Sequence, residues 1–273
     1  MIPAAFDYLR AGSAEEAVAA LGEHGDDAKL LAGGMSLLPL MKLRLATPAI
    51  LVDVGRVREL SYVRDAGERL AVGALTRHRD LETNDVLADQ CAALRAVAAE
   101  VGDNQVRHRG TIGGSVAHGD PASDLPALLL ALDATFVVRG PGGERTVPAR
   151  EFFHGFLETA LEPDELLTEI QVPKLPGAGF SYQKFQRRAQ DWAIVGAMAV
   201  RNGGTRVALV NMGGTPLRAT GVEESLAQGA SPAEAAQRAA EGTEPPGDLN
   251  ATPDYREHLA RVLVRRALEA ASA

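Results

Sequence analysis

Two glycine-rich segments carry the residue types that best suit the binding of a phosphate. The first is Ala32-Gly33-Gly34-Met35-Ser36, and the second, about eighty residues further on, is Gly110-Thr111-Ile112-Gly113-Gly114-Ser115. Paired glycines let the backbone turn sharply and lie close to a ligand, and the unpaired N–H groups of such a turn form a concavity that suits an anion. Ser36 adds a hydroxyl donor or a helix cap. The two segments could therefore hold one diphosphate from two sides; the alternative is that each merely turns the chain.

Short apolar strands and helices must position the first segment. Residues 30–32 should form a buried strand that leads into it, and residues 37–45 a helix with Pro39 in its first turn. Residues 50–54 then read as a second strand. This order predicts a small βαβ-like unit of about fifty residues with the glycine turn inside it.

The second segment has a polar, basic approach at residues 101–109 and an apolar helix at residues 125–132 beyond it. The pattern around it predicts a hairpin over 61–72, helices near 76–82 and 86–101, a hairpin at 136–147 and a strand at 166–172. After a proline- and glycine-rich boundary near residue 176, the pattern changes to three antiparallel strands at 180–185, 193–201 and 206–212. Helices near 221–228, 232–241 and 254–271 follow.

Composition excludes several classes of function. The formal net charge of −8 argues against a nucleic acid or an anionic membrane as partner. No apolar run is long enough to span a bilayer, and the N-terminus lacks a leader pattern, so we expect a cytoplasmic protein without membrane insertion. Cys91 is the only cysteine, so no disulfide or iron–sulfur cluster can be built within the chain. The six histidines show no zinc spacing, and we predict no metal site.

The two motifs and the residues around them resemble one known family over essentially the whole chain. Besides the glycine segments, the resemblance rests on Lys42-Leu43-Arg44, Gln105-Val106-Arg107-His108-Arg109, His118-Gly119-Asp120-Pro121-Ala122-Ser123-Asp124-Leu125-Pro126-Ala127 and Asp191-Trp192-Ala193. This combination is similar to the FAD-binding medium subunit of the molybdenum hydroxylases, the family of aerobic carbon monoxide dehydrogenase and xanthine dehydrogenase.

The resemblance implies an α+β fold with two parts. Residues 1–175 would form a two-lobed vanillyl-alcohol-oxidase (PCMH)-type FAD-binding domain, with lobes of about 1–55 and 56–175 and FAD lying between them. Residues 176–273 would form a C-terminal domain of the carbon monoxide dehydrogenase flavoprotein type, with a three-stranded antiparallel sheet and helices.

The resemblance also implies a set of cofactor-binding residues. They are Leu31, Ala32, Gly33, Gly34, Met35 and Ser36 for the diphosphate, Thr111, Ile112, Gly113, Gly114 and Ser115 for the other half of that clamp, Asp124 as an acid that helps hold the cofactor, Leu167 as an apolar neighbour of the flavin or adenine end, and Lys184 and Trp192 near the isoalloxazine. Met35 stands where some relatives carry His, and Ser115 where many relatives carry Asp or Asn. Neither departure removes a backbone N–H.

Four of these features have plainer alternatives. Asp124 could simply cap the helix that follows it, and Lys184 could be a solvated strand lysine. Trp192, the only tryptophan, could anchor a core or an interface. Residues 107–109, which are Arg, His and Arg, could face a phosphate, face an acidic partner, or lie in a solvated loop.

The function that the resemblance implies is electron transfer rather than turnover of the organic or gaseous substrate. A large subunit would hold the molybdenum-pterin cofactor, a small subunit two [2Fe–2S] clusters, and FAD in this chain would pass electrons to an external acceptor such as a quinone or NAD. The expected assembly is a dimer of heterotrimers. We predict no catalytic residue in this chain, since it shows no obvious nucleophile–base arrangement. Two alternatives remain: a self-contained FAD-dependent oxidase or reductase of the same flavin fold, and a non-catalytic nucleotide- or anion-binding scaffold.

Overall fold

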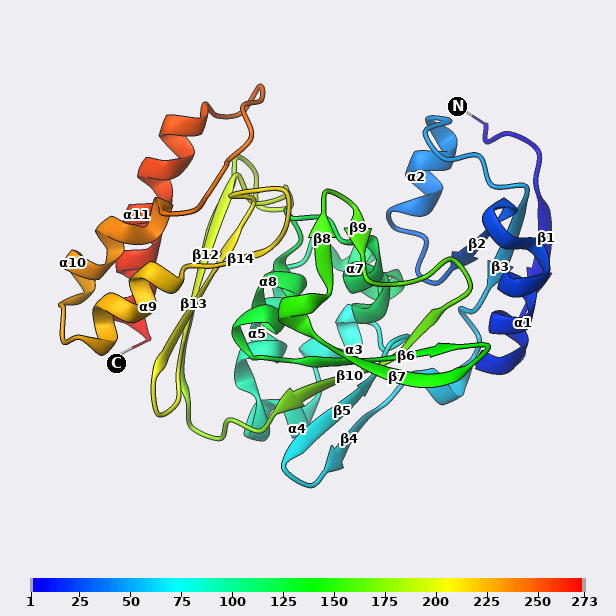
Figure 1. The fold of residues 1–273 in the computed structure, drawn as a ribbon, viewed down its shortest axis with the longest axis horizontal. Helices are drawn as coiled ribbons and strands as arrows, with labels where there is room; N and C mark the ends of the chain where they lie inside the picture. The colour runs from blue at the N-terminus through cyan, green and yellow to red at the C-terminus, as the bar shows by residue number, and fades with distance from the viewer. Residues whose placement is uncertain (1, 272–273) are drawn as a thin grey trace.

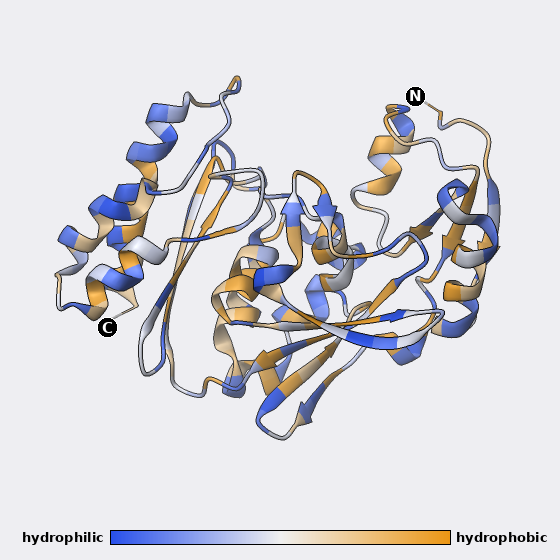
Figure 2. Ribbon diagram, viewed as in Figure 1, coloured by the Kyte–Doolittle hydropathy of each residue, from blue (hydrophilic) through white to orange (hydrophobic). Residues whose placement is uncertain are grey.

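The computed structural model describes residues 2–271. Three main sheets follow one another across the molecule, each covered by helices (Figure 1). Hydrophobic residues concentrate on the strands and on the helix sides that face them (Figure 2). Within residues 2–271, no helix is both long and apolar enough to cross a bilayer.

The first sheet is parallel and has the order β1-β3-β2, formed by β1 (Asp7–Arg10), β2 (Ala28–Leu31) and β3 (Ile50–Asp53). Helix α1 (Ala14–His24) begins at Ser13, whose side chain accepts the N–H of Glu16, and it buries Ala17, Val18 and Leu21. Helix α2 (Leu37–Lys42) is shorter than predicted and ends before Arg44, which has a φ of 59°. Because the strands are parallel, the segments after β2 and β3 leave the sheet at the same edge.

The second sheet is antiparallel, with the order β4-β5-β10-β6-β7. Its strands are β4 (Val63–Ala66), β5 (Arg69–Gly73), β6 (Thr135–Gly140), β7 (Gly143–Pro148) and β10 (Leu166–Pro173). The helices that accompany it are α3 (His78–Glu82), α4 (Asp85–Gln90), α5 (Ala92–Ala99), α6 (Asn104–Arg109), α7 (Ile112–His118) and α8 (Asp124–Ala131). A small hairpin of β8 (Phe153–Gly155) and β9 (Glu158–Thr159) lies after them.

The third sheet is antiparallel and contains β11 (Gly179–Phe185), β12 (Val195–Arg201), β13 (Thr205–Val210) and β14 (Leu217–Arg218). The prediction gave three strands; the two-residue β14 adds a fourth, which pairs with β13 at Ala208 and Leu209. Helices α9 (Thr220–Ala227), α10 (Pro232–Ala235) and α11 (Pro253–Ala270) follow. The 3₁₀ helices of the chain are η1 (Gly25–Asp27), η2 (Arg58–Leu60), η3 (Ala149–Glu151) and η4 (Ala236–Ala240).

Side chains on the two faces of β12 enter different cores. Met198 and Val200 join the core of the second sheet, together with residues of α5 and α8. Ala197 and Ala199 face the helices that follow the third sheet. The third sheet is therefore packed on both faces, which explains why residues 195–200 of β12 are buried and carry no polar side chain, rather than alternating.

Two local predictions differ from the structure, and one segment without a predicted conformation forms a helix. The basic approach to the second glycine segment is the helix α6, capped by Asp103, whose carboxylate accepts the N–H of Val106 at 2.8 Å. The predicted helix over 86–101 is interrupted at Cys91, which separates α4 from α5. The second Gly-Gly pair does not form a turn; it lies in the first turn of α7, capped by the Thr111 side chain.

Candidate functional site

The two glycine segments are in direct contact. A Cβ atom added to Gly33 would lie 2.3 Å from the carbonyl oxygen of Arg109 and 2.9 Å from the Cα of Gly110. Both neighbours are backbone atoms, so they could not move aside as a flexible side chain can. The first segment therefore needs glycine at this position because the backbone that leads into the second segment passes against it.

The first segment presents unused backbone donors. No acceptor within residues 2–271 takes an N–H of Ala32, Gly33, Gly34, Met35 or Ser36. The carbonyl of Gly34, by contrast, accepts the N–H of Leu38 at 3.1 Å, and Gly34 itself adopts a φ of +76°. A run of open N–H groups around a left-handed glycine is the arrangement that binds an anion.

The second segment uses its N–H groups inside the protein. Gly113 donates to the carbonyl of Ala74 at 2.8 Å, Gly114 to the hydroxyl of Thr111 at 3.1 Å, and Ser115 to the carbonyl of Thr111 at 3.0 Å. Ile112, which is fully buried, donates to the carbonyl of Thr76 at 3.1 Å. The segment thus serves as a fixed platform beneath the first one, and the donors that remain open are those of residues 32–36.

A basic cleft lies beside this contact. One cavity of about 260 Å³ and an adjoining cavity of about 320 Å³ share Gly55, Arg56 and Arg77 as lining residues. The first is also lined by Leu31, Ala32, Asp53 and Arg109, and the second by Val57, Arg58, Ser61 and Leu75. The cleft therefore sits at the carboxyl edge of the parallel sheet, where β2 and β3 end, and it gathers four arginines.

Arg77 connects the cleft to the glycine contact. Its guanidinium donates to the carbonyl of Arg109, the same carbonyl that lies against Gly33. Burial lowers the pKa of Arg77, and repulsion by the Arg109 guanidinium adds to this effect. A guanidinium that is partly buried beside another one gains most from an anion that binds between them.

Most residues of this cleft were not predicted from the sequence. Arg56, Arg58 and Arg77 were not among the predicted site residues. One signal was available for the first two, because Gly55-Arg56 follows the buried β3 directly and ligands of α/β sheets bind outside the carboxyl ends of parallel strands. Arg77 lies between β5 and α3, and only the three-dimensional fold brings it to the cleft.

His78 supports the second segment from below. The backbone N–H of His78 donates to the carbonyl of Gly110 at 3.0 Å, and a Cβ at Gly110 would lie 2.6 Å from the Cδ2 of the His78 ring. Burial lowers the pKa of His78 to about 4, with further lowering by the charges of Arg77 and Arg107. The ring is therefore neutral at physiological pH and acts as packing under Gly110.

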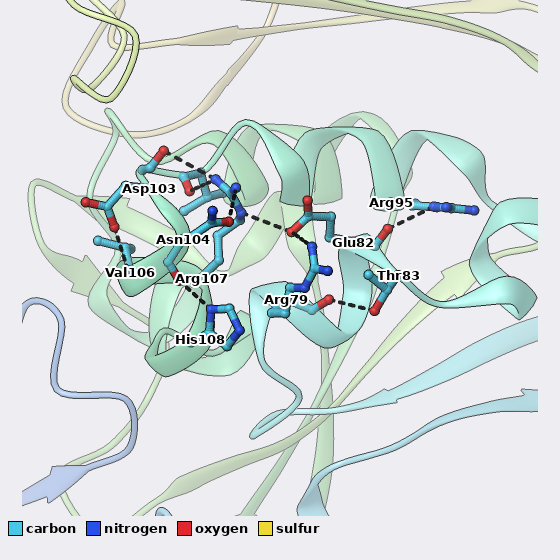
Figure 3. Close-up of polar contacts among 11 residues, drawn as sticks. Arg79, Glu82, Thr83, Arg95, Asp103, Asn104, Val106, Arg107 and His108 are labelled. Atoms are coloured by element: carbon cyan, nitrogen blue, oxygen red, sulfur yellow. Dashed lines mark hydrogen bonds and ion pairs between the residues drawn. The ribbon is translucent and has the colours of Figure 1, made fainter.

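Arg107 is a structural residue rather than a ligand-facing one. Its guanidinium lies 3.0 Å from the Glu82 carboxylate, and it also donates to the side chain of Asn104 at 2.8 Å (Figure 3). Arg79 shares the same Glu82 at 3.0 Å, and the ring of His108 bonds the carbonyl of Asn104 (Figure 3). These contacts fasten α6 to α3, so that of the three basic residues 107–109 it is Arg109 that lines the cleft.

Asp124 and Lys184 form a buried ion pair between the second and third sheets. The Lys184 ammonium lies 2.8 Å from the Asp124 carboxylate and donates to the carbonyl of Glu100 at 2.9 Å. The hydroxyl of Tyr182 donates to the other carboxylate oxygen of Asp124. Burial raises the pKa of Asp124, against the opposing effect of Lys184. Lys184 is therefore not a solvated strand lysine; its side chain is only 6% exposed.

The remaining predicted residues occupy three different environments. Met35 is partly exposed beside the open donors, and Ser115 is half-buried in α7. Leu167 is buried in the core, where it pairs with Val138 next to a bulge in β10. Trp192 lies in the loop between β11 and β12 with 56% of its surface exposed, so it is not a core anchor of this chain.

Within residues 2–271, no group of three or more histidine, cysteine, aspartate or glutamate side chains could hold a metal ion. The site instead consists of open backbone donors at residues 32–36 beside a basic cleft. These features define a domain that binds an extended, phosphate-bearing cofactor.

Comparisons with known proteins identify which cofactor domain this is. Residues 4–175 match the family described as "FAD binding domain in molybdopterin dehydrogenase", and residues 180–271 match "CO dehydrogenase flavoprotein C-terminal domain". The chain is 45% identical to the carbon monoxide dehydrogenase medium chain of Hydrogenophaga pseudoflava, over 99% of this chain and 98% of that one. It is 38% identical to subunit alpha of the 6-hydroxypseudooxynicotine dehydrogenase complex of Paenarthrobacter nicotinovorans, over 98% of this chain and 95% of that one.

A solved structure shows the same fold. The chain matches carbon monoxide dehydrogenase from Hydrogenophaga pseudoflava, in a form that lacks the Mo-pyranopterin moiety of its cofactor, with a TM-score of 0.96 and 44% identity over 100% of this chain and 99% of that one. The chain therefore belongs to the family of FAD-binding medium subunits of the molybdenum hydroxylases. The expected fold class and FAD-binding character are confirmed.

Proposed function

We propose that this chain carries electrons through FAD within a molybdenum hydroxylase, from a [2Fe–2S] subunit to an external acceptor such as a quinone or NAD. The molybdenum-pterin cofactor would lie in a large subunit and the iron–sulfur clusters in a small one, in a dimer of heterotrimers. Relatives support this division, because they are named as medium chains or subunits of dehydrogenases. We also propose the domain division at about residue 175 and a cytoplasmic location, as the sequence predicted.

The observation that carries the proposal is the row of open N–H groups at residues 32–36 above a cleft with four arginines. The residues fit a dinucleotide, since its diphosphate needs donors and positive charge together. Bound FAD would supply the ability to accept electrons singly and release them in pairs. The chain's own residues would hold the diphosphate on the first glycine segment, with Arg77 and Arg109 compensating its charge.

Other predicted residues receive narrower roles. Trp192, exposed on its loop, would cover one face of the flavin ring. Asp124 and Lys184 would support this region by joining α8 to β11, because their charged atoms are already paired with each other. Thr111, Gly113 and Ser115 would act through the platform they form rather than through free donors.

The most specific part of the proposal concerns the substrate that the complex oxidises. Carbon monoxide is favoured, because the relative at 45% identity is named for it. The relative at 38% identity is named for 6-hydroxypseudooxynicotine, which shows that similar medium subunits serve complexes with different substrates. The substrate would be selected by the large subunit, so residues of this chain do not discriminate between them.

The test is to purify the chain from its native host with whatever co-purifies, and to record the subunit pattern and the absorption spectrum. Released FAD, iron–sulfur absorption and two additional bands, one large and one small, would support the proposal. Carbon monoxide and aldehyde or heterocyclic substrates would then be screened with an artificial electron acceptor. A single yellow band that oxidises or reduces a small molecule alone would favour the self-contained flavoenzyme instead. A colourless chain that takes up no FAD would overturn both.

A further inference from the structure

The loop that carries Trp192, residues 186–194, is held at its C-terminal end by two side chains from distant elements. Asn211, which follows β13, donates from its amide nitrogen to the carbonyl of Ala193 at 2.8 Å. Arg256, fully buried in α11, donates to the carbonyl of Ile194. These carbonyls directly follow Trp192 in the chain, so both bonds restrict where the indole can lie.

Asn211 also connects this loop to the FAD-binding part of the chain. Its backbone N–H donates to the carbonyl of Pro121 at 2.9 Å, and Pro121 lies in the connection between α7 and α8. Helix α7 starts in the second glycine segment and has seven residues, which corresponds to about 10 Å along its axis. One residue thus links the platform under the diphosphate cradle, through α7, to the loop of the exposed indole.

The backbone of Asn211 makes this link specific to a few residue types. Its φ is +61°, in the left-handed region that non-glycine residues seldom adopt. Asparagine tolerates this region better than most residues, and glycine accepts it freely but has no side-chain donor. A non-glycine residue keeps this conformation where the surrounding structure holds it there, and here the two hydrogen bonds of Asn211 do so.

We propose that Asn211 is a positioning residue that fixes Trp192 relative to the flavin ring by bridging the α7–α8 connection and the Trp192 loop. The inference rests on the proposed function, because it requires FAD in the cleft. Asn211 is not one of the residues 32–36 that would hold the diphosphate. Removing its side chain should therefore change how the Trp192 indole covers the flavin ring without releasing FAD.

The substitution Asn211→Asp tests the bridge with little change in shape. It keeps a residue that tolerates the left-handed conformation and keeps the N–H to Pro121, but it places a carboxylate oxygen against the carbonyl of Ala193. The matched control is Asn202→Asp, which makes the same change of charge in the exposed turn between β12 and β13, at the other end of the same strands. Asn211→Gly is the second variant, since it preserves the backbone conformation and removes only the side-chain donor.

Flavin emission from the FAD-loaded full-length chain is the main readout, because contact with an indole quenches it. Loss of one hydrogen bond should raise the uncovered fraction, and with it the emission, about fivefold. The FAD dissociation constant should change less than about twofold, because the cradle is untouched. Amide hydrogen exchange in the Trp192 loop of the FAD-free chain should accelerate in the same variants, and Asn202→Asp should match the wild type in every measurement.

Two results would overturn the inference. Either the Asn211 variants bind FAD with wild-type emission and wild-type exchange in the loop, or Trp192→Phe fails to raise the emission of the wild-type chain, so that the indole does not cover the ring. If Asn211→Asp does not fold, Asn211→Gly decides between these outcomes. A wild-type chain that binds no FAD would refute the proposed function itself, and that result is distinct because it appears before any variant is made.

Discussion

The contact at Gly33 gives the sharpest prediction about FAD binding. In Gly33→Ala, the new Cβ would lie 2.3 Å from the carbonyl oxygen of Arg109, whereas ordinary contacts begin near 3.4 Å, so the two glycine segments must separate by about 1 Å. Forcing one extra carbon into a close-packed place costs about 1–3 kcal/mol. The free chain can relax by moving residues 32–36 away, but FAD binding requires them to return. The cost should therefore appear in binding, as a loss of affinity of about 5- to 150-fold.

The assay is a titration of the FAD-free chain with FAD, followed by flavin emission and by calorimetry, with the melting temperature measured in parallel. The matched control is Gly22→Ala in α1, where a Cβ would meet nothing within 4 Å. That control should bind FAD normally and be more stable by about 0.5–1 kcal/mol, because alanine favours a helix over glycine. If Gly33→Ala binds FAD as tightly as the wild type, the close contact of the two segments does not govern the cradle and the reasoning is wrong.

Three further predictions concern titratable side chains. Arg77→Met should weaken FAD binding about 10- to 100-fold, because it removes a charged donor beside the diphosphate, whereas Arg150→Met on the exposed surface should leave the titration unchanged. The neutral ring of His78 contributes folding stability that is fully present above the ordinary histidine pKa of 6.5 and is lost as the pH falls through about 4, by about 3 kcal/mol in all. His78→Gln should flatten the dependence of the unfolding free energy on pH in this range, measured by denaturant unfolding. An unchanged slope of that free energy against pH would contradict the prediction. Lys184→Met should destabilise the fold by about 3–5 kcal/mol, because the buried Asp124 carboxylate loses its ion-pair partner and keeps only the Tyr182 hydroxyl. Adding Asp124→Asn should recover most of the loss in thermal melts, and a double variant as unstable as the single one would speak against a direct pair.

Local sequence patterns were sufficient to predict much of the fold. The strands predicted at 180–185, 193–201 and 206–212 correspond to β11, β12 and β13, and the turn at residues 202–204 is the hairpin connection between the last two. These patterns succeed because apolar runs and turn residues act within a few positions of each other. The conformation of the second glycine pair, which was predicted as a turn and lies in α7, was missed for the same reason. Its role depends on Ala74, which lies close to Gly113 in space and far from it in sequence.

The site residues also divide into those that local sequence predicts and those that depend on distant parts of the chain. The open N–H groups of the first glycine segment could be predicted from its residues alone, because these donors belong to its own backbone. The partners of Asp124 and Lys184 could not, since the pair forms only when the third sheet packs on α8. Arg77 carries no local pattern that distinguishes it from a surface arginine, and only the fold brings it beside Arg56 in the lining of the cleft.

The separation of the apolar core into clusters has a consequence for the order in which the chain folds and binds FAD. The second and third sheets share one core, so they should fold and melt as a single cooperative unit. The first sheet has a smaller core around Ala17, Leu21 and Val52, and this core also contains Leu75 and Leu166 from later in the chain. Although residues 7–53 leave the ribosome first, their core cannot be completed until Leu166 has been synthesised. We therefore expect FAD to bind late in biogenesis, when the first sheet packs against the second and third sheets, which have already folded.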